Sequence, residues 1–457
     1  MKYVILFLLL PFLSNAQLIT EYAGCASCAP VLGDGGPATA AYIDDPCGCT
    51  FSKNGVFFVA SGAANRIRRI DTNGIITTIA GTGFGGYSGD GGQATSARFH
   101  SLEDITLDTA GNIFVVDVYN FAIRRIDIIT GIINTICGNG TSGSIGDGGP
   151  ASAAQITNVN EICFDKHGNL YLAELDNPKI RKINTSGIIS TFAGTGVAGY
   201  NGDGIAATAA QLYGPTGVTA DDSGNIYIAD GNSRVRKVNT AGIISTFAGN
   251  GLPTYIGDGI PATNAQIGAS YLKFDSSHNL FIVDESTNLR VYKVDTSGIL
   301  HCVAGNGIDV DTGDGGPATA AAIFTPCGIA LDRCNNLYIT LINYNRIRKV
   351  TFEPSCDPFS NFDSASLNVK TTTTNEVSIY PNPAYSSITI TTSCGDSMGE
   401  VKIEGVVISN FIGQTVFSQI YDIEKAEVNI AGLPEGMYIV KIIGNDGKVI
   451  VRKIVKE

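Results

Sequence analysis

The sequence is poor in several residue types on which common functional sites depend. Among its 457 residues there is no tryptophan, there are only four histidines, and charged residues make up 16%. A serine-based catalytic triad needs a well-placed histidine, and no Gly-x-Ser-x-Gly motif is present. The spacing of the cysteines and histidines fits no zinc site. The net charge of −12, without a concentration of basic residues, argues against nucleic-acid binding.

Long apolar runs are also missing, except at the beginning of the chain. Residues 1–16 contain one lysine, an apolar run and small residues at the positions that precede a cleavage site, as in a secretory signal peptide. This run is too short to span a membrane, and no later run is long enough. The sequence therefore predicts export with removal of residues 1–16, and no transmembrane segment. Export permits disulfide bonds among the 11 cysteines.

Glycine is abundant, with 55 copies, and much of it belongs to one repeated segment. The motif Gly-Asp-Gly begins at residues 33, 89, 146, 202, 257 and 313, so that successive starts differ by 56, 57, 56, 55 and 56 residues. A constant period of this length indicates an array of one supersecondary unit. Each unit contains four short runs rich in β-branched and aromatic residues, separated by turn residues, as in the blade of a β-propeller.

The order of these runs predicts how the array closes. The run of the type "GIISTFAG", which ends the other units, opens the chain at residues 18–24 and is missing after the last unit. We therefore expect residues 18–24 to complete the last blade, which hides two strand edges at once. The predicted fold class is all-β: a six-bladed propeller over residues 17–352, closed by its N-terminal strand.

The units resemble NHL repeats, most clearly in "GNIYIADGNSRVRKV", which begins at Gly224. The resemblance extends over residues 18–352 and implies a propeller. It implies no single activity, because propellers of this kind serve as binding platforms, as adhesion modules and, in some relatives, as lyases or hydrolases.

The composition of the sequence changes after Phe352. Residues 353–376 are rich in serine, threonine and asparagine and are predicted to be a linker. Short strand-like runs then resume over residues 377–457, which predicts a small Ig-like β-sandwich. This segment is similar to the type A C-terminal sorting domain of the type IX secretion system of Bacteroidota. The matching residues include Tyr380, Pro381, Asn382, Pro383, Gly436 and Tyr438.

This second resemblance implies a route and a partner. The chain would interact with the type IX secretion machinery through residues 377–457 and reach the medium or the outer-membrane surface. Such a domain is usually removed after export, and the sequence leaves open whether the propeller is then released or attached to the cell.

The aspartates of the Gly-Asp-Gly motifs are interpreted as structural. No copy contains the lysine of a phosphate-binding loop, and one carboxylate per copy is too few for a calcium loop. We expect each aspartate to cap the short helix that follows, and the glycines to permit positive φ. The residues concerned are Asp34, Asp90, Asp147, Asp203, Asp258 and Asp314.

Acidic residues occur on the innermost strands of the second and third units. Glu103, Asp104, Asn160 and Glu161 are candidate calcium ligands near one mouth of the propeller channel, because oxygen ligands suit calcium. The same residues also fit a solvated acidic rim with no bound ion, or hydrogen bonds between blades, since adjacent residues of a strand point to opposite faces. No cofactor is required by the sequence, and calcium is the candidate.

Two cysteine pairs are candidate disulfides. Cys47 and Cys327 occupy the same position in the first and last units, which are neighbours once the ring closes. A disulfide between them would lock the closure. Cys334 and Cys356 form a second candidate pair near the end of the last unit.

Together these features favour a binding scaffold that is not an enzyme and that recognises a protein or a glycan through loops on a rigid frame. The alternative is a metal-dependent lyase or hydrolase at the channel mouth. Such an enzyme needs ligands from several blades, whereas the acidic candidates come from two. A purely structural surface module is a third interpretation, and the sequence does not name the ligand.

Overall fold

The computed structural model describes residues 17–25, 31–352, 375–380, 384, 386–394, 403–410, 415–423, 425–434, 436–444 and 449–456. The proposed signal peptide, residues 353–374 of the proposed linker, Cys356 and residues 381–383 of the sorting motif lie outside these ranges.

Residues 18–351 form antiparallel sheets of four or five strands, which we number along the chain. Sheet 1 contains β2 (Pro46–Phe51), β3 (Phe57–Ser61), β4 (Arg66–Ile70) and β5 (Ile76–Ala80). Sheet 2 contains β6 (Leu102–Leu107), β7 (Ile113–Asp117), β8 (Ala122–Ile126) and β9 (Ile133–Cys137). Sheet 3 contains β10 (Val159–Phe164), β11 (Leu170–Glu174), β12 (Lys179–Ile183) and β13 (Ile189–Ala193).

The remaining three sheets of this region have the same four-strand arrangement, with an added short strand in two of them and an outer strand from the N-terminus in the third. Sheet 4 contains β15 (Gly217–Ala220), β16 (Ile226–Asp230), β17 (Arg234–Val238), β18 (Ile243–Ala248) and the short β14 (Ile205–Ala206). Sheet 5 contains β20 (Leu272–Phe274), β21 (Leu280–Asp284), β22 (Arg290–Val294), β23 (Ile299–Ala304) and the short β19 (Ile260–Pro261). Sheet 6 contains β24 (Pro326–Leu331), β25 (Leu337–Leu341), β26 (Arg346–Thr351) and β1 (Leu18–Gly24).

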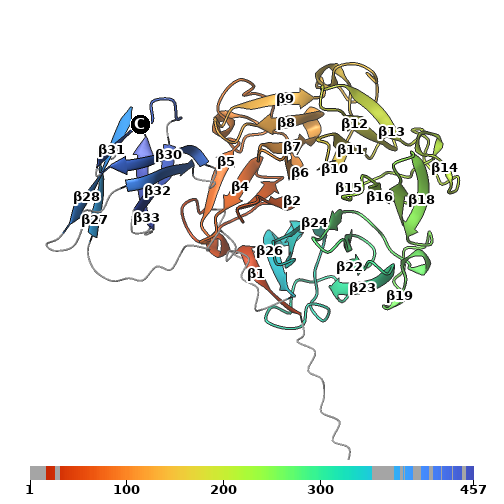
Figure 1. Cartoon of the computed structure of the whole chain (residues 1–457). Helices are drawn as coiled ribbons and strands as arrows, with labels where there is room; N and C mark the ends of the chain where they lie inside the picture. The colour runs from red at the N-terminus through yellow and green to blue at the C-terminus, as the bar shows by residue number, and fades with distance from the viewer. Residues whose placement is uncertain are drawn as a thin grey trace, which may run out of the picture.

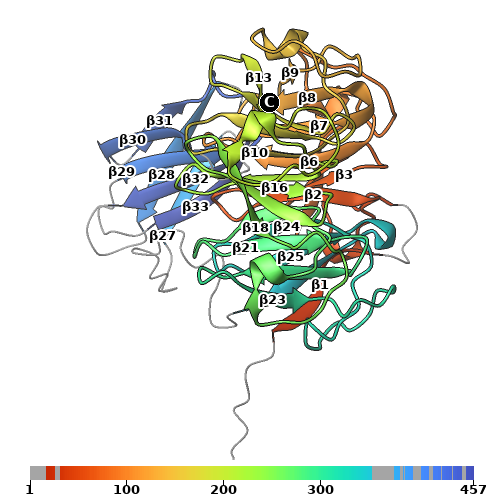
Figure 2. The same cartoon turned by 90° about the vertical axis from the view of Figure 1, so that its right-hand side faces the viewer.

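The sheets are arranged around a central axis in a propeller-like fashion (Figure 1). The first strand of each sheet lies innermost and touches the first strand of the next sheet, in the order β2, β6, β10, β15, β20, β24 and again β2. Figure 2 shows the same sheets from the side, where many of their strands run across the view. The apolar core lies between neighbouring sheets: Ile67 of sheet 1, for example, packs in one cluster with Phe99, Ile113 and Val115.

β1 is the outer strand of sheet 6, although it lies more than 300 residues before its neighbour. It pairs antiparallel with β26, and Ile19 stands opposite Val350. The segment that leads into sheet 6 also bonds to β1, because Gly315 N donates to Ile19 O at 2.8 Å. The start and the end of this region are thus joined in one sheet.

The turns between the first and second strands explain why the units form hairpins. In sheets 2 to 6 an aspartate begins the turn, and one carboxylate oxygen accepts the backbone N–H groups two and four residues later. Such an Asx turn satisfies backbone donors that the strands leave unpaired. The aspartates are Asp108, Asp165, Asp221, Asp275 and Asp332.

The aspartates of the Gly-Asp-Gly motifs do not have the role that the sequence suggested. Short 3-10 helices follow five of the motifs: η1 (Ala38–Ala40), η2 (Ala94–Ser96), η4 (Ala151–Ala153), η5 (Ala207–Ala209) and η6 (Ala262–Asn264). None of these five helices has a side-chain cap. The cap prediction is therefore wrong. In four of these five motifs an arginine of the following sheet binds the carboxylate instead.

That arginine comes from the third strand of the sheet and is fully buried. The distances from the guanidinium to the motif carboxylate are 2.9 Å for Arg68–Asp34, 2.7 Å for Arg124–Asp90, 2.6 Å for Arg181–Asp147, 2.9 Å for Arg236–Asp203 and 2.8 Å for Arg348–Asp314. In sheets 2, 3 and 4 a second, fully buried carboxylate at the end of the second strand also approaches the guanidinium. Each pair fixes the segment that leaves one sheet onto the middle of the next.

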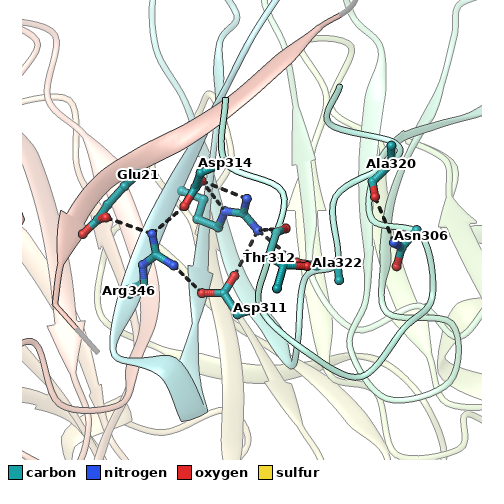
Figure 3. A network of polar contacts seen from close by, with 9 residues as sticks. Glu21, Asn306, Asp311, Thr312, Asp314, Ala320, Ala322 and Arg346 are labelled. Carbon is teal, nitrogen blue, oxygen red and sulfur yellow. Dashed lines mark hydrogen bonds and ion pairs between the residues drawn. The ribbon is translucent and has the colours of Figure 1, made fainter. Parts of the chain in front are cut away.

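The pair in sheet 6 is extended by further contacts (Figure 3). Asp314 also binds Arg346, which contacts Asp311 at 2.6 Å and Glu21 of β1 at 2.9 Å. This network attaches the N-terminal strand to the last sheet through ionic contacts in addition to the backbone ladder.

Sheet 5 is the exception. Its third strand carries Tyr292 in place of the arginine, and the motif carboxylate of Asp258 accepts hydrogen bonds from Tyr255 Oη at 2.7 Å and Cys302 N at 2.6 Å. The rings of Tyr255 and Tyr292 stack at 5.5 Å. Aromatic packing thus replaces the ion pair in this sheet.

The C-terminal segment forms two separate sheets. One contains β27 (Asn375–Tyr380), β28 (Ser387–Cys394) and β31 (Lys425–Asn429); the other contains β30 (Thr415–Ile423), β29 (Ile403–Asn410), β32 (Gly436–Gly444) and β33 (Val449–Lys456). Ile388, Val406, Tyr438 and Ile454 belong to their common apolar cluster. These sheets fit an Ig-like domain. Within the described ranges the remaining elements are η3 (Val118–Asn120) and η7 (Ile342–Tyr344), and no helix there is long and apolar enough to cross a membrane.

The buried ion pair predicts that two adjacent arginines contribute very differently to the free energy of unfolding. Arg124 is buried with Asp117, whereas the side chain of Arg125 is one-third exposed beside Asp127. Arg124→Met leaves a buried carboxylate without its partner and is expected to lower the free energy of unfolding by about 3–5 kcal/mol. Arg125→Met, the matched control, is expected to cost under about 1 kcal/mol. Denaturant titration followed by circular dichroism measures both, and equal losses would contradict the role of the buried pair.

Candidate functional site

The acidic candidates lie on the innermost strands β6 and β10, and neighbouring residues point in different directions. Glu103 faces sheets 1 and 5: its Oε1 accepts a hydrogen bond from Tyr271 Oη at 2.8 Å and lies 3.4 Å from Cys47 Sγ. Asp104 faces sheet 3, where its Oδ2 accepts the N–H of Ile162 at 2.8 Å. The alternation of side chains along a strand explains this divergence.

Glu161 continues the same pattern on β10. Its Oε2 accepts the N–H groups of Val218 at 2.8 Å and Leu272 at 3.3 Å, and so binds sheets 4 and 5. Asn160 is half-buried. Asp104 and Glu161 therefore act as hydrogen-bonding links between first strands. This geometry matches the interpretation as links between blades, while the calcium site stays a prediction.

Burial changes the protonation of these groups. It raises the pKa of Glu103 to about 7, an effect that the Tyr271 hydroxyl opposes and that the charges of Glu285, Asp104 and Asp45 increase. Burial also raises the pKa of Asp104 and of Glu161, and the charge of Asp104 adds to the rise at Glu161. The ammonium of Lys273 opposes both shifts.

Glycine allows the first strands to approach one another at this level of the axis. A Cβ atom on Gly48 would lie 2.4 Å from Cα of Asp104, and one on Gly328 would lie 2.4 Å from the carbonyl oxygen of Cys47. No side chain fits at such distances, so these positions require glycine.

A disulfide joins Cys47 of β2 to Cys327 of β24, with a Cα–Cα distance of 5.2 Å. The two cysteines and Glu103 are the one group of three potential metal-ligating residues found within the described ranges, and both sulfurs belong to the disulfide. Cys334 is also disulfide-bonded, while its candidate partner Cys356 lies outside the described residues. Cys49, two residues from Cys47, is a buried free thiol.

A cavity of about 950 Å³ opens where the hairpin turns of sheets 1, 2 and 3 approach the axis. Its walls include the rings of Phe51, Phe58, Phe114 and Phe164, and Lys273 of β20 reaches it from sheet 5. A second cavity of 380 Å³ lies beside it and shares Lys273 and Phe164. A cavity of this size suits a small-molecule ligand.

A small side chain on the fourth strand of sheet 2 contributes to this cavity. In sheets 3 and 4, a tyrosine of the second strand packs edge-to-face on a phenylalanine of the fourth strand, with 4.9 Å between the centroids of Tyr171 and Phe192 and of Tyr227 and Phe247. Sheet 2 has Phe114 and Ile136 at these positions, and both line the cavity. The phenylalanine of sheets 3 and 4 is thus replaced by a smaller side chain here. Sheets 1 and 5 also carry aliphatic residues at this position, Ile79 and Val303.

Sequence reasoning missed this cavity. A comparison of the units for metal ligands does not reveal it, because the cavity is lined by Ile136 where sheets 3 and 4 have a phenylalanine. The signal was present as Ile136 in the column that contains Phe192 and Phe247.

The described residues of the sorting motif have structural roles. Tyr438 of β32 is buried and donates a hydrogen bond to Pro434 O at 2.7 Å, and Gly436 has a φ of +148°. Tyr380, at the end of β27, is 48% exposed. An exposed aromatic residue at this place is available to another molecule.

Two family models match parts of the chain. Residues 378–457 match the secretion system C-terminal sorting domain, and residues 14–84, 137–200 and 195–254 match the teneurin NHL domain. Teneurin-1 of Gallus gallus is 29% identical over 243 residues, which is 45% of this chain and 8% of that protein. Teneurin-3 of Mus musculus is 30% identical over 244 residues, with 45% and 8% covered. The chain thus spans less than a tenth of the length of these relatives.

Solved structures share the fold. A protein of unknown function from Bacteroides thetaiotaomicron superposes with a TM-score of 0.54 and 17% identity, over 74% of this chain and 76% of that one. An auxiliary nutrient binding protein from the same organism has a TM-score of 0.54 and 14% identity, with the same shares covered. At these identities the likeness shows the fold alone.

The disulfide makes a prediction for the number of free thiols. Cys47→Ser releases Cys327, so the denatured, unreduced variant is expected to contain one more reactive thiol than the parent protein. Cys49→Ser, the matched control, removes a free thiol and is expected to contain one fewer. Titration with a thiol reagent gives the counts, and an unchanged count for Cys47→Ser would refute the disulfide. Loss of the cross-link is also expected to cost about 2–5 kcal/mol of stability.

The raised pKa of Glu103 makes a prediction for the pH dependence of stability. Between about pH 4.5 and pH 7 the folded state retains a proton at Glu103 that the unfolded state has lost, so this residue makes stability fall as pH rises. Glu103→Gln cannot titrate and removes that slope. Melting temperatures of both proteins from pH 5 to pH 8 test the expectation. A difference between the two proteins that stays constant with pH would show that the pKa of Glu103 is not raised.

Proposed function

We propose that this chain, which carries NHL-type propeller repeats and a type IX secretion C-terminal sorting domain, is a binding scaffold for a protein or a glycan. The sorting domain directs the chain to the cell surface or the medium through the type IX machinery. The ligand-binding part is the region of residues 17–352, and it acts outside the cell.

The proposed frame is a closed six-bladed propeller. Its support is the cyclic contact of the first strands, from β2 through β24 and back to β2, and the pairing of β1 with β26 in sheet 6. Closure leaves no free edge at the junction of the first and last units, which makes the frame rigid. A rigid frame holds variable loops in fixed positions for recognition.

The cavity between sheets 2 and 3 is the observation that carries the proposal. It is of ligand size, and aromatic rings line it. The surface offers additional aromatic residues, because Phe84, Tyr119 and Tyr213 are 69%, 60% and 57% exposed. Exposed aromatic side chains are typical of binding surfaces.

The solved structures are consistent with this proposal. Two of those that share the fold are described as auxiliary nutrient binding proteins, from Bacteroides thetaiotaomicron and Bacteroides ovatus. Their description names binding and no reaction. Applied to this chain, it supports a role in capturing an external molecule.

The proposal predicts a specific ligand for the exported protein. The protein without residues 1–16, purified with its sorting domain, is expected to bind a restricted set of glycans on an array, or one surface protein in a pull-down from cell envelopes. The heat-denatured protein at the same concentration is the control for adhesion. Retention of no glycan and no protein beyond this control would refute the scaffold function.

A further inference from the structure

We propose that the cavity between sheets 2 and 3 binds a saccharide that bears a carboxylate, with Lys273 as the partner of that carboxylate. This inference rests on the proposed binding function and specifies its site and ligand class. The location can be followed in Figure 1, where β2, β6 and β10 lie side by side near the axis.

The polar groups of the cavity form part of a ring around the axis. Thr50, Thr106 and Lys273 occupy equivalent positions on the first strands of sheets 1, 2 and 5, opposite Phe58, Phe114 and Phe281. Thr219 holds this position in sheet 4 and lines the adjoining cavity. Within the described part of the chain, none of these three hydroxyls nor the Lys273 ammonium has a hydrogen-bond partner of its own. They are therefore available to a ligand.

The carboxylates around the cavity are already engaged. Asp108 accepts N–H groups of its own turn and the side-chain amide of Asn112, and Asp165 accepts the same kinds of donor and the hydroxyl of Tyr171. Asp104 and Glu161, which lie near Lys273, accept backbone N–H groups of neighbouring strands. The free groups of the cavity are thus an ammonium and hydroxyls, and these favour a ligand that supplies an anionic oxygen.

Size and shape favour a saccharide over a simple anion. The cavity volume of about 950 Å³ exceeds what a small anion fills and lies within the range of about 300–1,000 Å³ seen for organic ligands. Phe51, Phe114 and Phe164 offer apolar surface to the C–H faces of sugar rings, and the threonine hydroxyls can bond to sugar hydroxyls. An acidic disaccharide combines these properties with a carboxylate for Lys273.

The role of the ligand's carboxylate is tested by calorimetry, which measures the affinity of the protein without residues 1–16 for a galacturonate disaccharide and for its neutral galactose counterpart. The acidic sugar is expected to bind at least ten times more tightly than the neutral one. Lys273→Met is expected to weaken the acidic sugar at least tenfold and the neutral sugar less than twofold. Lys293→Met, on β22 of the same sheet and away from the cavity, is the matched control and is expected to change neither. Equal binding of the two sugars by the parent protein, or an unchanged preference in Lys273→Met, would overturn the inference.

The location is tested by introducing the ring that sheets 3 and 4 have at the position of Ile136. Ile136→Phe introduces the ring that Phe247 supplies in sheet 4, and it is expected to weaken both sugars at least tenfold while the melting temperature is retained. Ile79→Phe, at the same position in sheet 1 and outside this cavity, is the control. If Ile136→Phe binds as well as the parent, the ligand does not occupy this cavity. A protein that selects glycans on the array but is insensitive to both cavity variants refutes this inference and leaves the scaffold function standing.

Discussion

The fold depends on a charge that has no access to water. In five of the sheets an arginine guanidinium lies fully buried in the middle of the sheet, where it is stable only with a carboxylate beside it. The motif that supplies this carboxylate lies in the segment that comes from the preceding sheet. In these five sheets the segment from the preceding sheet therefore helps to neutralise the buried charge, together with a second carboxylate of the same sheet in sheets 2, 3 and 4. Apolar burial between sheets stabilises the array, but the ion pair fixes where the connecting segment docks.

The axis is held by a second, smaller set of polar contacts. The carboxylates of Asp104 and Glu161 each accept a backbone N–H group of another first strand and so link neighbouring sheets near the axis. Glu103 reaches Tyr271 on the opposite side of the ring, and the disulfide between Cys47 and Cys327 joins the first and last sheets. These contacts differ from sheet to sheet, so the centre of the molecule is the part in which the repeats are least alike.

The sequence predicted features that repeat and missed those that depend on a distant partner. The period of the Gly-Asp-Gly motif predicted the propeller-like array, and the run at residues 18–24 predicted the pairing of β1 with the last sheet. The role of Asp90 differs from the predicted helix cap because its partner, Arg124, lies 34 residues away, beyond the reach of a local capping pattern. The sequence nevertheless contains an indication of this partner. Five units have an arginine at the same third-strand position, and the remaining unit has Tyr292 there. The sequence predicts the strands that carry the acidic candidates, which are Glu103, Asp104, Asn160 and Glu161. It does not predict the direction of each side chain, which depends on the strand register.

Departures from the repeat locate the chemistry that is specific to this protein. An arginine that neutralises a buried carboxylate cannot be replaced without a compensating change, as the tyrosine pair of sheet 5 illustrates. The first strands carry no such buried arginine, and one of their positions differs between units: the position of Lys273 is threonine in three sheets, cysteine in sheet 3 and alanine in sheet 6. Ile136 varies a fourth-strand position in the same way and opens a cavity without disturbing any ion pair. A scaffold built from repeats can therefore acquire a ligand site by changing these columns, because the interactions that hold the sheets together lie in other positions.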